Sequence, residues 1–261
     1  MGTSIENPVL ELHNLTVVYE SKPALWNVDY GIPKNQLIGV VGPNGSGKST
    51  MLKAIMGLVE PSSGYAHIYG KPIDEIRGKV AYVPQRSSVD WDFPVNVFDA
   101  VLMGRYKGKN LFKRASKEDK EIAMEAIRKV QLEPFIKRQI SQLSGGQQQR
   151  VFIARALAQQ ADMYLLDEPF AGVDAATENA IMTLLKEMNE QGKTILVVHH
   201  DLQSVQDYFD WLILMNTRLI AAGPTKEIFT QEQLQKTYGG KLNILSRVVE
   251  IIEKQGHPIR E

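Results

Sequence analysis

The chain has 261 residues, of which 43% are hydrophobic, so it can bury a full core as one large domain or as a core with a subdomain. Thirty basic residues balance thirty acidic ones with no basic stripe, so no nucleic acid is expected as a partner. The absence of cysteine excludes disulfides and thiolate metal sites.

The apolar segments predict that the chain does not enter a membrane by itself. Residues 1–7 have neither the basic flank nor the apolar run of a secretory signal. The apolar runs at 195–198 and 211–215 have the length of strands and are too short to cross a bilayer. If the protein acts at a membrane, we expect another chain to span it.

The N-terminal region predicts a β-rich layer. Residues 9–19 alternate between apolar and polar side chains, and a second strand is expected to start at Lys22. Tyr19 closes the first strand. Its ring is suited to stacking on an adenine, and it is equally suited to an ordinary place at a strand end, so both interpretations stay open.

A glycine-rich loop follows the apolar run 37–41 and fits G-x-x-x-x-G-K-[ST] at every fixed position. Its glycines let backbone N–H groups turn inward around a polyphosphate, and the next helix presents its positive end to the anion. Lys48 is expected to reach the β- and γ-phosphates, and the Ser49 hydroxyl to bind Mg²⁺. The loop consists of Gly42, Pro43, Asn44, Gly45, Ser46, Gly47, Lys48, Ser49 and Thr50. Alone, it predicts an NTPase.

A predicted strand at 80–83 ends at Pro84, where the backbone must leave the sheet, so Gln85 lies at its carboxyl end. Such positions face the ligand in a parallel sheet, and the Gln85 amide is expected to meet both Mg²⁺ and the attacking water. From Arg86 to Ala161 the pattern becomes helical, with a capping box that starts at Ser116. This segment predicts a helical insertion.

Ser144 precedes two glycines and caps a helix predicted over 148–159. The start of that helix is a second potential anion-binding terminus. A serine followed by two glycines is more often an ordinary helix start, so this motif gains its weight from the surrounding motifs.

The apolar run 163–166 predicts a buried strand that ends in Asp167 and Glu168, just before Pro169. Two carboxylates at the end of a buried apolar strand are costly unless they have partners. One such partner is Mg²⁺ bound through Asp167, with Glu168 orienting or deprotonating the water that attacks the γ-phosphate. The alternative is a solvated strand end.

Asp174 is expected to cap a surface helix over 177–190, and a further buried strand at 194–198 ends in His199-His200-Asp201. A histidine at this strand end is suited to hydrogen-bonding the γ-phosphate. The same three residues also suggest a transition-metal site, as in a metal-binding regulatory protein.

These motifs together resemble the ATP-binding subunit of an ABC transporter, over residues 8 to about 225. The motif LSGGQ at 143–147 is that family's signature. The resemblance implies an α/β fold: a P-loop NTPase (RecA-like) core with an N-terminal antiparallel β-subdomain and an inserted α-helical signature subdomain. It implies one ABC ATPase domain over 1–261, with β-subdomain and core in 8–85 and 161–225, the helical subdomain in 86–160 and a short C-terminal tail in 226–261.

The resemblance also implies an ATPase that uses ATP and Mg²⁺. The catalytic residues would be Glu168, His200, Gln85 and Lys48, and the Mg²⁺ ligands Ser49, Gln85 and Asp167. The ATP-binding residues would be the loop 42–50, Tyr19 at the adenine, Asp174 of the D-loop, and Ser144, Gly145, Gly146 and Gln147 of the signature.

The family's geometry implies that the chain pairs head to tail with a second copy of itself. The signature of one copy, residues 144–147, would then cap the γ-phosphate held by Lys48 of the other. ATP would favour the closed pair over the open one, because only bound triphosphate completes both helix termini.

A narrower resemblance, carried by residues 88–94, 101–106 and 170–174, is to the ATPases of manganese, zinc and iron importers, with manganese favoured. It implies integral membrane permease subunits as partners, an extracytoplasmic metal-binding protein as an indirect one, and a peripheral place on the cytoplasmic face of a bacterial membrane. The alternatives are a zinc or iron importer and an ABC ATPase without a membrane partner. Val89, Trp91 and Phe93 are expected either to dock on the membrane subunit or to pack in the helical core.

Overall fold

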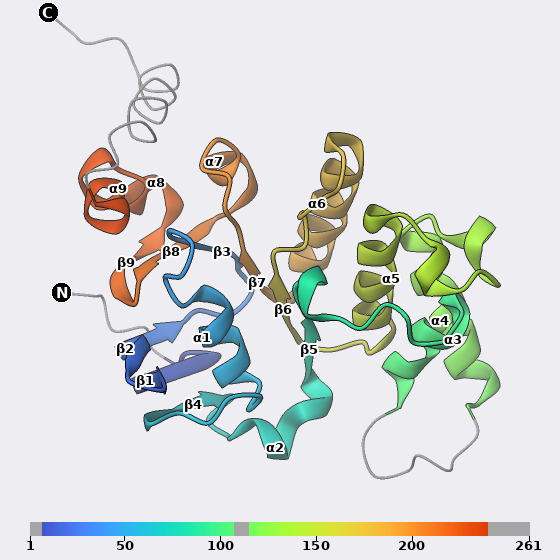
Figure 1. Cartoon of the computed structure of the whole chain (residues 1–261), viewed down its shortest axis with the longest axis horizontal. Coiled ribbons are helices and arrows are strands. Elements are labelled where there is room, and N and C mark those ends of the chain that lie inside the picture. Colours follow the sequence, from blue (N-terminus) through green and yellow to red (C-terminus); the bar gives the residue numbers. More distant parts are fainter. Residues whose placement is uncertain (1–6, 107–114, 240–261) are drawn as a thin grey trace, which may run out of the picture. The chain divides into compact units, whose positions relative to one another are not determined.

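The computed structural model describes residues 7–106 and 115–239, and these form two compact units (Figure 1). The first unit holds the chain up to Ile73 and again from Val198, and the second unit is Asp74–Val197. Residues 240–261, most of the predicted tail 226–261, lie outside the described residues. The expected boundaries of the β-subdomain, core and helical subdomain, at 85/86, 160/161 and 225/226, stay a prediction.

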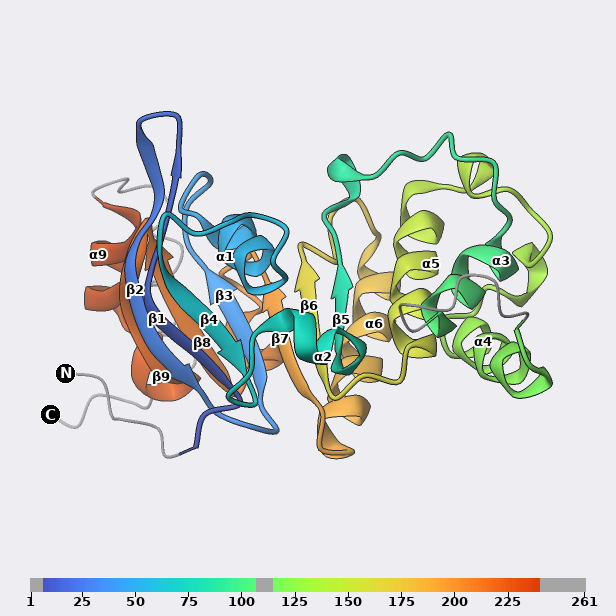
Figure 2. The same cartoon turned by 90° about the horizontal axis from the view of Figure 1, so that it is seen from below.

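The first unit begins with the antiparallel layer that the sequence predicts. β1 (Leu10–Tyr19) lies between β2 (Lys22–Ile32) and β4 (Ser63–Ile68), and the three strands are seen side by side in Figure 2. In the register of β1 with β2, Tyr19 pairs with Lys22, so Tyr19 closes the hairpin. The predicted N-terminal antiparallel β-subdomain is therefore confirmed.

Three further strands of the first unit position the phosphate loop. β3 (Leu37–Val41) is buried along its whole length and runs parallel to β8 (Trp211–Asn216), which pairs in turn with antiparallel β9 (Arg218–Pro224). A strand buried on both faces is a continuous apolar run, as the sequence has it. The loop leads from β3 into α1 (Lys48–Ile55) and so lies at the carboxyl end of a buried parallel strand, where α/β proteins bind ligands.

The second unit places its polar residues at a similar sheet edge. β5 (Val80–Val83) is parallel to β6 (Met163–Asp167), and Val83 pairs with Leu166. Because the carboxyl ends of parallel strands meet at one edge, Gln85 and Asp167 come close together. β7 (Thr194–Val198) follows β6 in the strand order, and α6 (Ala175–Glu190) connects the two. The predicted α/β class is confirmed.

The helical segment of the second unit contains α3 (Val97–Leu102), α4 (Lys117–Lys129) and α5 (Gly145–Ala158). The capping box of α4 is present as predicted: the Ser116 hydroxyl accepts from the Asp119 N–H at 3.1 Å, and the Asp119 carboxylate accepts from the Ser116 N–H at 3.0 Å. α5 begins at Gly145 and not at 148, since the signature glycines form its first turn despite their low helix propensity. The inserted helical signature subdomain is thus confirmed.

The remaining helices among the described residues are short. They are α2 (Ile73–Ile76), α7 (Val205–Tyr208), α8 (Thr225–Ile228), α9 (Gln231–Tyr238) and the single 3₁₀ turns Arg77–Lys79, Arg86–Ser88, Met103–Arg105, Glu133–Phe135 and Ile140–Gln142. Among residues 7–106 and 115–239, no helix combines the length and the apolarity that crossing a bilayer requires.

Candidate nucleotide site

The phosphate loop, residues 42–50, has the conformation that its glycines predict. Gly45 and Gly47 have φ of 80° and 94°, a region that glycine adopts without strain. Lys48 is buried, and its Nζ donates to the carbonyl oxygens of Gly42 and Pro43, both at 2.9 Å. The ammonium group is therefore held against the backbone of the loop itself.

The start of α1 has no side-chain cap. Gly47 is the N-cap residue and has no side chain that could accept a hydrogen bond from the first turn. Ser49 and Thr50 follow Lys48 in that turn and are half-buried. Positive helix ends of this kind bind phosphate through backbone N–H groups.

Two other predicted residues of the first unit are exposed. Tyr19 is 46% exposed at the end of β1, which suits a stacking ring as well as an ordinary strand end. His200 follows β7 and is exposed, while its neighbour His199 is buried. The structure thus separates the two adjacent histidines by their burial.

His199 belongs to a hydrogen-bond chain under the end of β7. Its ring Nε2 lies 2.8 Å from the Ser204 hydroxyl, which donates to the Asp201 carboxylate at 2.8 Å. Burial lowers the pKa of His199 to about 4, so its ring is neutral at neutral pH. In the part of the chain that the structure describes, no three His, Cys, Asp or Glu side chains are grouped to hold a metal ion. The alternative of a transition-metal site at His199, His200 and Asp201 is therefore contradicted.

In the second unit, the predicted glutamine and carboxylates lie together. Asp167 ends β6 fully buried, and Glu168 follows it half-buried with φ of 50°, an unusual backbone conformation for this residue type. Gln85 donates from Nε2 to Glu168 Oε2 at 2.8 Å. Burial and then the charge of nearby Asp167 raise the pKa of the Tyr82 phenol on β5. The cluster joins two neighbouring carboxyl groups to a glutamine that is hydrogen-bonded to one of them.

The signature residues form the start of α5. The Ser144 hydroxyl accepts from the Gln147 N–H at 3.3 Å, and Gln147 Oε1 accepts from the Ser144 N–H at 2.9 Å. This is a capping box, which satisfies donors that a helix start otherwise leaves open. A Cβ placed on Gly146 would lie 3.5 Å from the Val173 side chain, so the signature lies next to the residue that precedes Asp174.

Asp174 caps α6 as predicted. Its carboxylate accepts from the Thr177 N–H at 2.8 Å and from the Thr177 hydroxyl at 3.0 Å. These bonds favour the charged form and lower the pKa of Asp174. The N-cap position thereby fixes the D-loop to the helix that follows it.

Arg86 is a site residue that sequence reasoning missed. Its guanidinium donates from Nε at 3.1 Å and from Nη2 at 2.9 Å to Gln148 Oε1 on α5, and Gln148 Nε2 donates to the Ile140 carbonyl at 3.1 Å. A Cβ on Gly145 would lie 3.1 Å from the Arg86 guanidinium carbon. Arg86 therefore ties the segment after Gln85 to the start of the signature helix. Its position directly after Gln85 is the sequence signal that could have identified it.

The aromatic residues after Gln85 divide between the two expectations. Trp91 donates from its indole N–H to the Arg86 carbonyl at 2.9 Å, and its ring lies 5.0 Å from that of Phe152 on α5, so Trp91 packs inside the unit. Val89 is half-buried, whereas Phe93 is 55% exposed. Phe93 is thus the member of the three that is free to dock on another chain.

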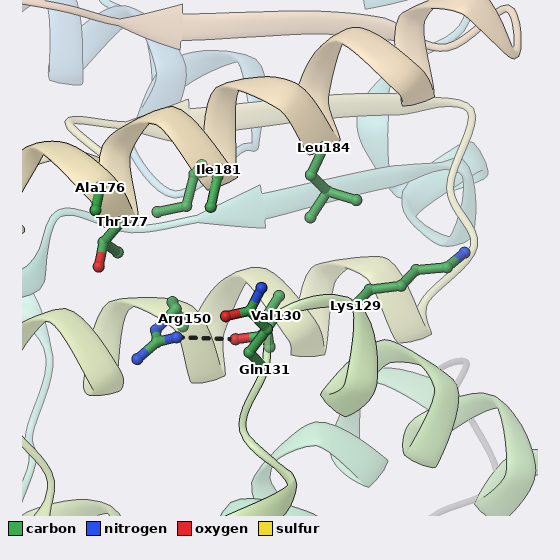
Figure 3. A pocket seen from close by; sticks show the side chains of 9 residues that line it. Lys129, Val130, Gln131, Arg150, Ala176, Thr177, Ile181 and Leu184 are labelled. Carbon is green, nitrogen blue, oxygen red and sulfur yellow. Dashed lines mark hydrogen bonds between the residues drawn. The ribbon is translucent and has the colours of Figure 1, made fainter.

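A cavity of about 140 Å³ lies elsewhere in the second unit (Figure 3). The end of α4 and Arg150 of α5 form one wall, and Ala176, Thr177, Ile181 and Leu184 of α6 form the other. Arg150 Nη1 donates to the Val130 carbonyl at 3.2 Å. None of the predicted site residues lines this cavity.

Comparison with known proteins shows the family. The family model described as "ABC transporter" matches residues 25–171. The manganese transport system ATP-binding protein MntB of Bacillus subtilis is 60% identical over 90% of this chain and 94% of its own length. The zinc transport system ATP-binding protein TroB of Treponema pallidum is 55% identical over 90% of this chain and 88% of its own length.

A solved structure resembles the fold as well. It is a dimeric ATP-binding cassette in a post-hydrolysis state with ADP and phosphate bound, 33% identical, with a TM-score of 0.72 over 82% of this chain and 98% of that one. The chain therefore belongs to the ABC transporter family, as one of the ATP-binding subunits that hydrolyse ATP.

Proposed function

We propose that this chain energises a membrane importer of divalent metal ions, and that the transported ion is manganese. The observation that carries this proposal is the 60% identity, over nearly the whole length of both chains, to a protein named as the ATP-binding subunit of a manganese transport system. Zinc is the second candidate, because the zinc transport protein TroB is 55% identical.

ATP would bind with its phosphates in the loop 42–50 and its adenine on Tyr19. Lys48 would contact the β- and γ-phosphates, and the first turn of α1, which no side chain caps, would supply N–H donors. Mg²⁺ would be held by Ser49, Gln85 and Asp167. Their oxygen atoms are the hard donors that this ion prefers. Because the Gln85 amide nitrogen donates to Glu168, the amide oxygen would be the atom that binds the ion. Bound Mg²⁺ would offset negative charge on the phosphate oxygens.

Hydrolysis would use Glu168 as general base. Its carboxylate would take a proton from the water that attacks the γ-phosphorus, and the bond from phosphorus to the ADP oxygen would break. The hydrogen bond from Gln85 supports this role, because it holds the Glu168 carboxylate in one orientation. His200 is exposed and available to hydrogen-bond the γ-phosphate.

A second copy of the chain would complete each site. Residues 144–147 of one copy would contact the γ-phosphate bound by the other copy, with Asp174 in the D-loop beside them. Support comes from the dimeric cassette with bound ADP and phosphate that the fold resembles. The anion preference of a helix start supports it too, since Ser144 and Gln147 lie at the first turn of α5.

Permease subunits would place the chain peripherally on the cytoplasmic face of a bacterial membrane, with an extracytoplasmic metal-binding protein as the indirect partner. Exposed Phe93 is our candidate for the contact with the permease. We further propose that residues 8–85 and 161–225 act as β-subdomain and core, 86–160 as the signature subdomain and 226–261 as the tail of a single ATPase domain.

The test is metal accumulation in cells that lack the native gene. The parental chain should restore uptake of Mn²⁺, measured by elemental analysis, and a Glu168→Gln chain made at the same level should not. Restoration of Zn²⁺ or iron instead would replace the proposed ion. A normal metal content in the deleted strain, together with no permease recovered on a tagged chain, would favour an ABC ATPase without a membrane partner.

A further inference from the structure

The tight turn between β8 and β9 lies against the phosphate loop. Asn216 pairs with Arg218 across this turn, and Thr217 between them has φ of 60°. The Thr217 N–H donates to the Ser46 carbonyl at 2.8 Å, and the Thr217 carbonyl accepts from the Trp26 N–H of β2 at 2.8 Å. A left-handed conformation is unfavourable for a β-branched residue and persists where surrounding contacts fix it. Both backbone groups of Thr217 supply such contacts.

At two glycines of the phosphate loop, the loop backbone lies very close to the backbones of β8 and β2. A Cβ on Gly42 would lie 2.0 Å from the Met215 carbonyl oxygen of β8, and a Cβ on Gly47 would lie 2.3 Å from the Ala24 carbonyl oxygen of β2. Only glycine permits such contacts between two backbones. The phosphate loop is therefore pressed at both ends against the strands that hold the turn.

The bond from Thr217 also determines where a phosphate-binding donor points. In a planar trans peptide the C=O and the N–H point in opposite directions. The carbonyl of Ser46 and the N–H of Gly47 belong to one peptide group. Because the Ser46 carbonyl points to Thr217, the Gly47 N–H points away from the turn, toward the side of the loop where a phosphate would bind.

Helix α9 contacts the turn through the side chain of Asn216. Asn216 Nδ2 donates to the Thr237 carbonyl at 3.0 Å. Thr237 is fully buried, and its hydroxyl donates to the Gln233 carbonyl at 2.7 Å. Hydrogen bonds from the neighbouring residues Asn216 and Thr217 thus link the turn to α9 on one side and to Ser46 on the other.

We infer that Thr217 is a positioning residue for triphosphate binding, and that α9 braces it through Asn216. The backbone of this turn orients the Gly47 N–H before the nucleotide arrives, and so lowers the cost of ordering the loop around the phosphates. The inference rests on the proposed role of the loop in binding ATP.

The test compares two substitutions at Thr217 that both remove its side chain. Thr217→Gly keeps the N–H donor and tolerates positive φ, whereas Thr217→Pro removes the donor and fixes φ near −65°. We expect the affinity for a non-hydrolysable ATP analogue, measured by titration, to stay within about twofold of the parent for glycine and to fall about tenfold or more for proline. A parent that fails to bind the analogue would count against the loop's role. A folded proline variant that binds as tightly as a binding parent would overturn the inference about the turn.

The brace is tested with Asn216→Ala, which leaves the turn's backbone intact and decides the matter if the proline variant does not fold. The matched control is Lys236→Ala, which breaks a surface ion pair with Glu232 on the same helix. We expect Asn216→Ala to raise the KM for ATP about threefold to tenfold with kcat retained, and Lys236→Ala to leave both unchanged. A merely structural loss would lower the melting temperature and kcat without moving the KM. Equal KM values for Asn216→Ala and the parent would show that α9 does not position the loop.

Discussion

The first turns of α1 and α5 present the same kind of backbone N–H groups but differ in whether a side chain caps them. The N-cap residue of α1 is Gly47, which has no side chain to cap the helix. The N-cap residue of α5 is Ser144, whose hydroxyl and backbone N–H both take part in a capping box with Gln147. The start of α1 therefore has no side-chain cap, while one N–H of the α5 start is capped by the Ser144 hydroxyl.

We expect this difference to give each terminus its own part in a nucleotide cycle. An uncapped start next to a buried lysine is suited to binding phosphate directly. At the capped start of α5 we expect a phosphate to take the Gln147 N–H from the Ser144 hydroxyl, which would then donate to the same phosphate. Binding at α5 would thereby be an exchange of partners, which suits a contact that forms and breaks in every cycle.

The largest expected effect is on the rate of hydrolysis. A chain that binds ATP without hydrolysing it allows the two helix starts to be compared by binding alone. In Glu168→Gln the carboxylate that would accept the proton becomes an amide, and hydrolysis should slow by on the order of 10² or more while ATP binding is kept. Phosphate release at saturating ATP and titration with ATP are the two measurements. A variant that turns over ATP at the parental rate would remove Glu168 from the role of general base.

The next effect breaks the uncapped terminus. Lys48→Ala would remove the proposed charge-assisted contact to phosphate, and we expect the affinity for ATP to fall at least about tenfold. Lys53→Ala, in the last turn of the same helix, is the matched control and should bind ATP as the parent does. Equal affinity of the Lys48→Ala chain and its control would show that α1 binds phosphate without the lysine.

The sequence predicted the phosphate loop at the start of α1, but it misplaced the start of α5 and did not reveal two contacts between distant residues. The pattern of residues 42–50 predicted the loop, because glycine and lysine at fixed spacing are what a phosphate requires. The start of α5 was predicted too late, since tertiary packing overrides the poor helix propensity of Gly145 and Gly146. Arg86 and Thr217 were missed because their contacts, to Gln148 and to Ser46, join positions far apart in the chain.

A smaller effect is the difference in the free energy of unfolding between alanine variants of Gly47, at the start of α1, and Gly146, at the start of α5. Gly47→Ala would place a Cβ 2.3 Å from the Ala24 carbonyl oxygen at φ of 94°, so we expect the free energy of unfolding to fall by about 2 kcal/mol. Gly146→Ala meets Val173 only at an ordinary 3.5 Å, and a better helix former should leave stability unchanged or raise it by less than about 1 kcal/mol. Urea unfolding of both variants measures the difference, and equal losses would contradict it.

The smallest effect sharpens the comparison by asking whether the cap of α5 does more than stabilise a helix. Ser144→Ala and Ser116→Ala each remove the serine of a capping box, one at α5 and one at α4, and each should lower the free energy of unfolding by about 1 kcal/mol. Only Ser144→Ala should also weaken the ATP-driven association of the Glu168→Gln chain, since only this hydroxyl is expected to pass from a helix N–H to a phosphate. Sedimentation with and without ATP distinguishes the two serines. If both variants associate like the Glu168→Gln parent, the Ser144 hydroxyl does not reach the nucleotide, and the exchange of partners at α5 is wrong.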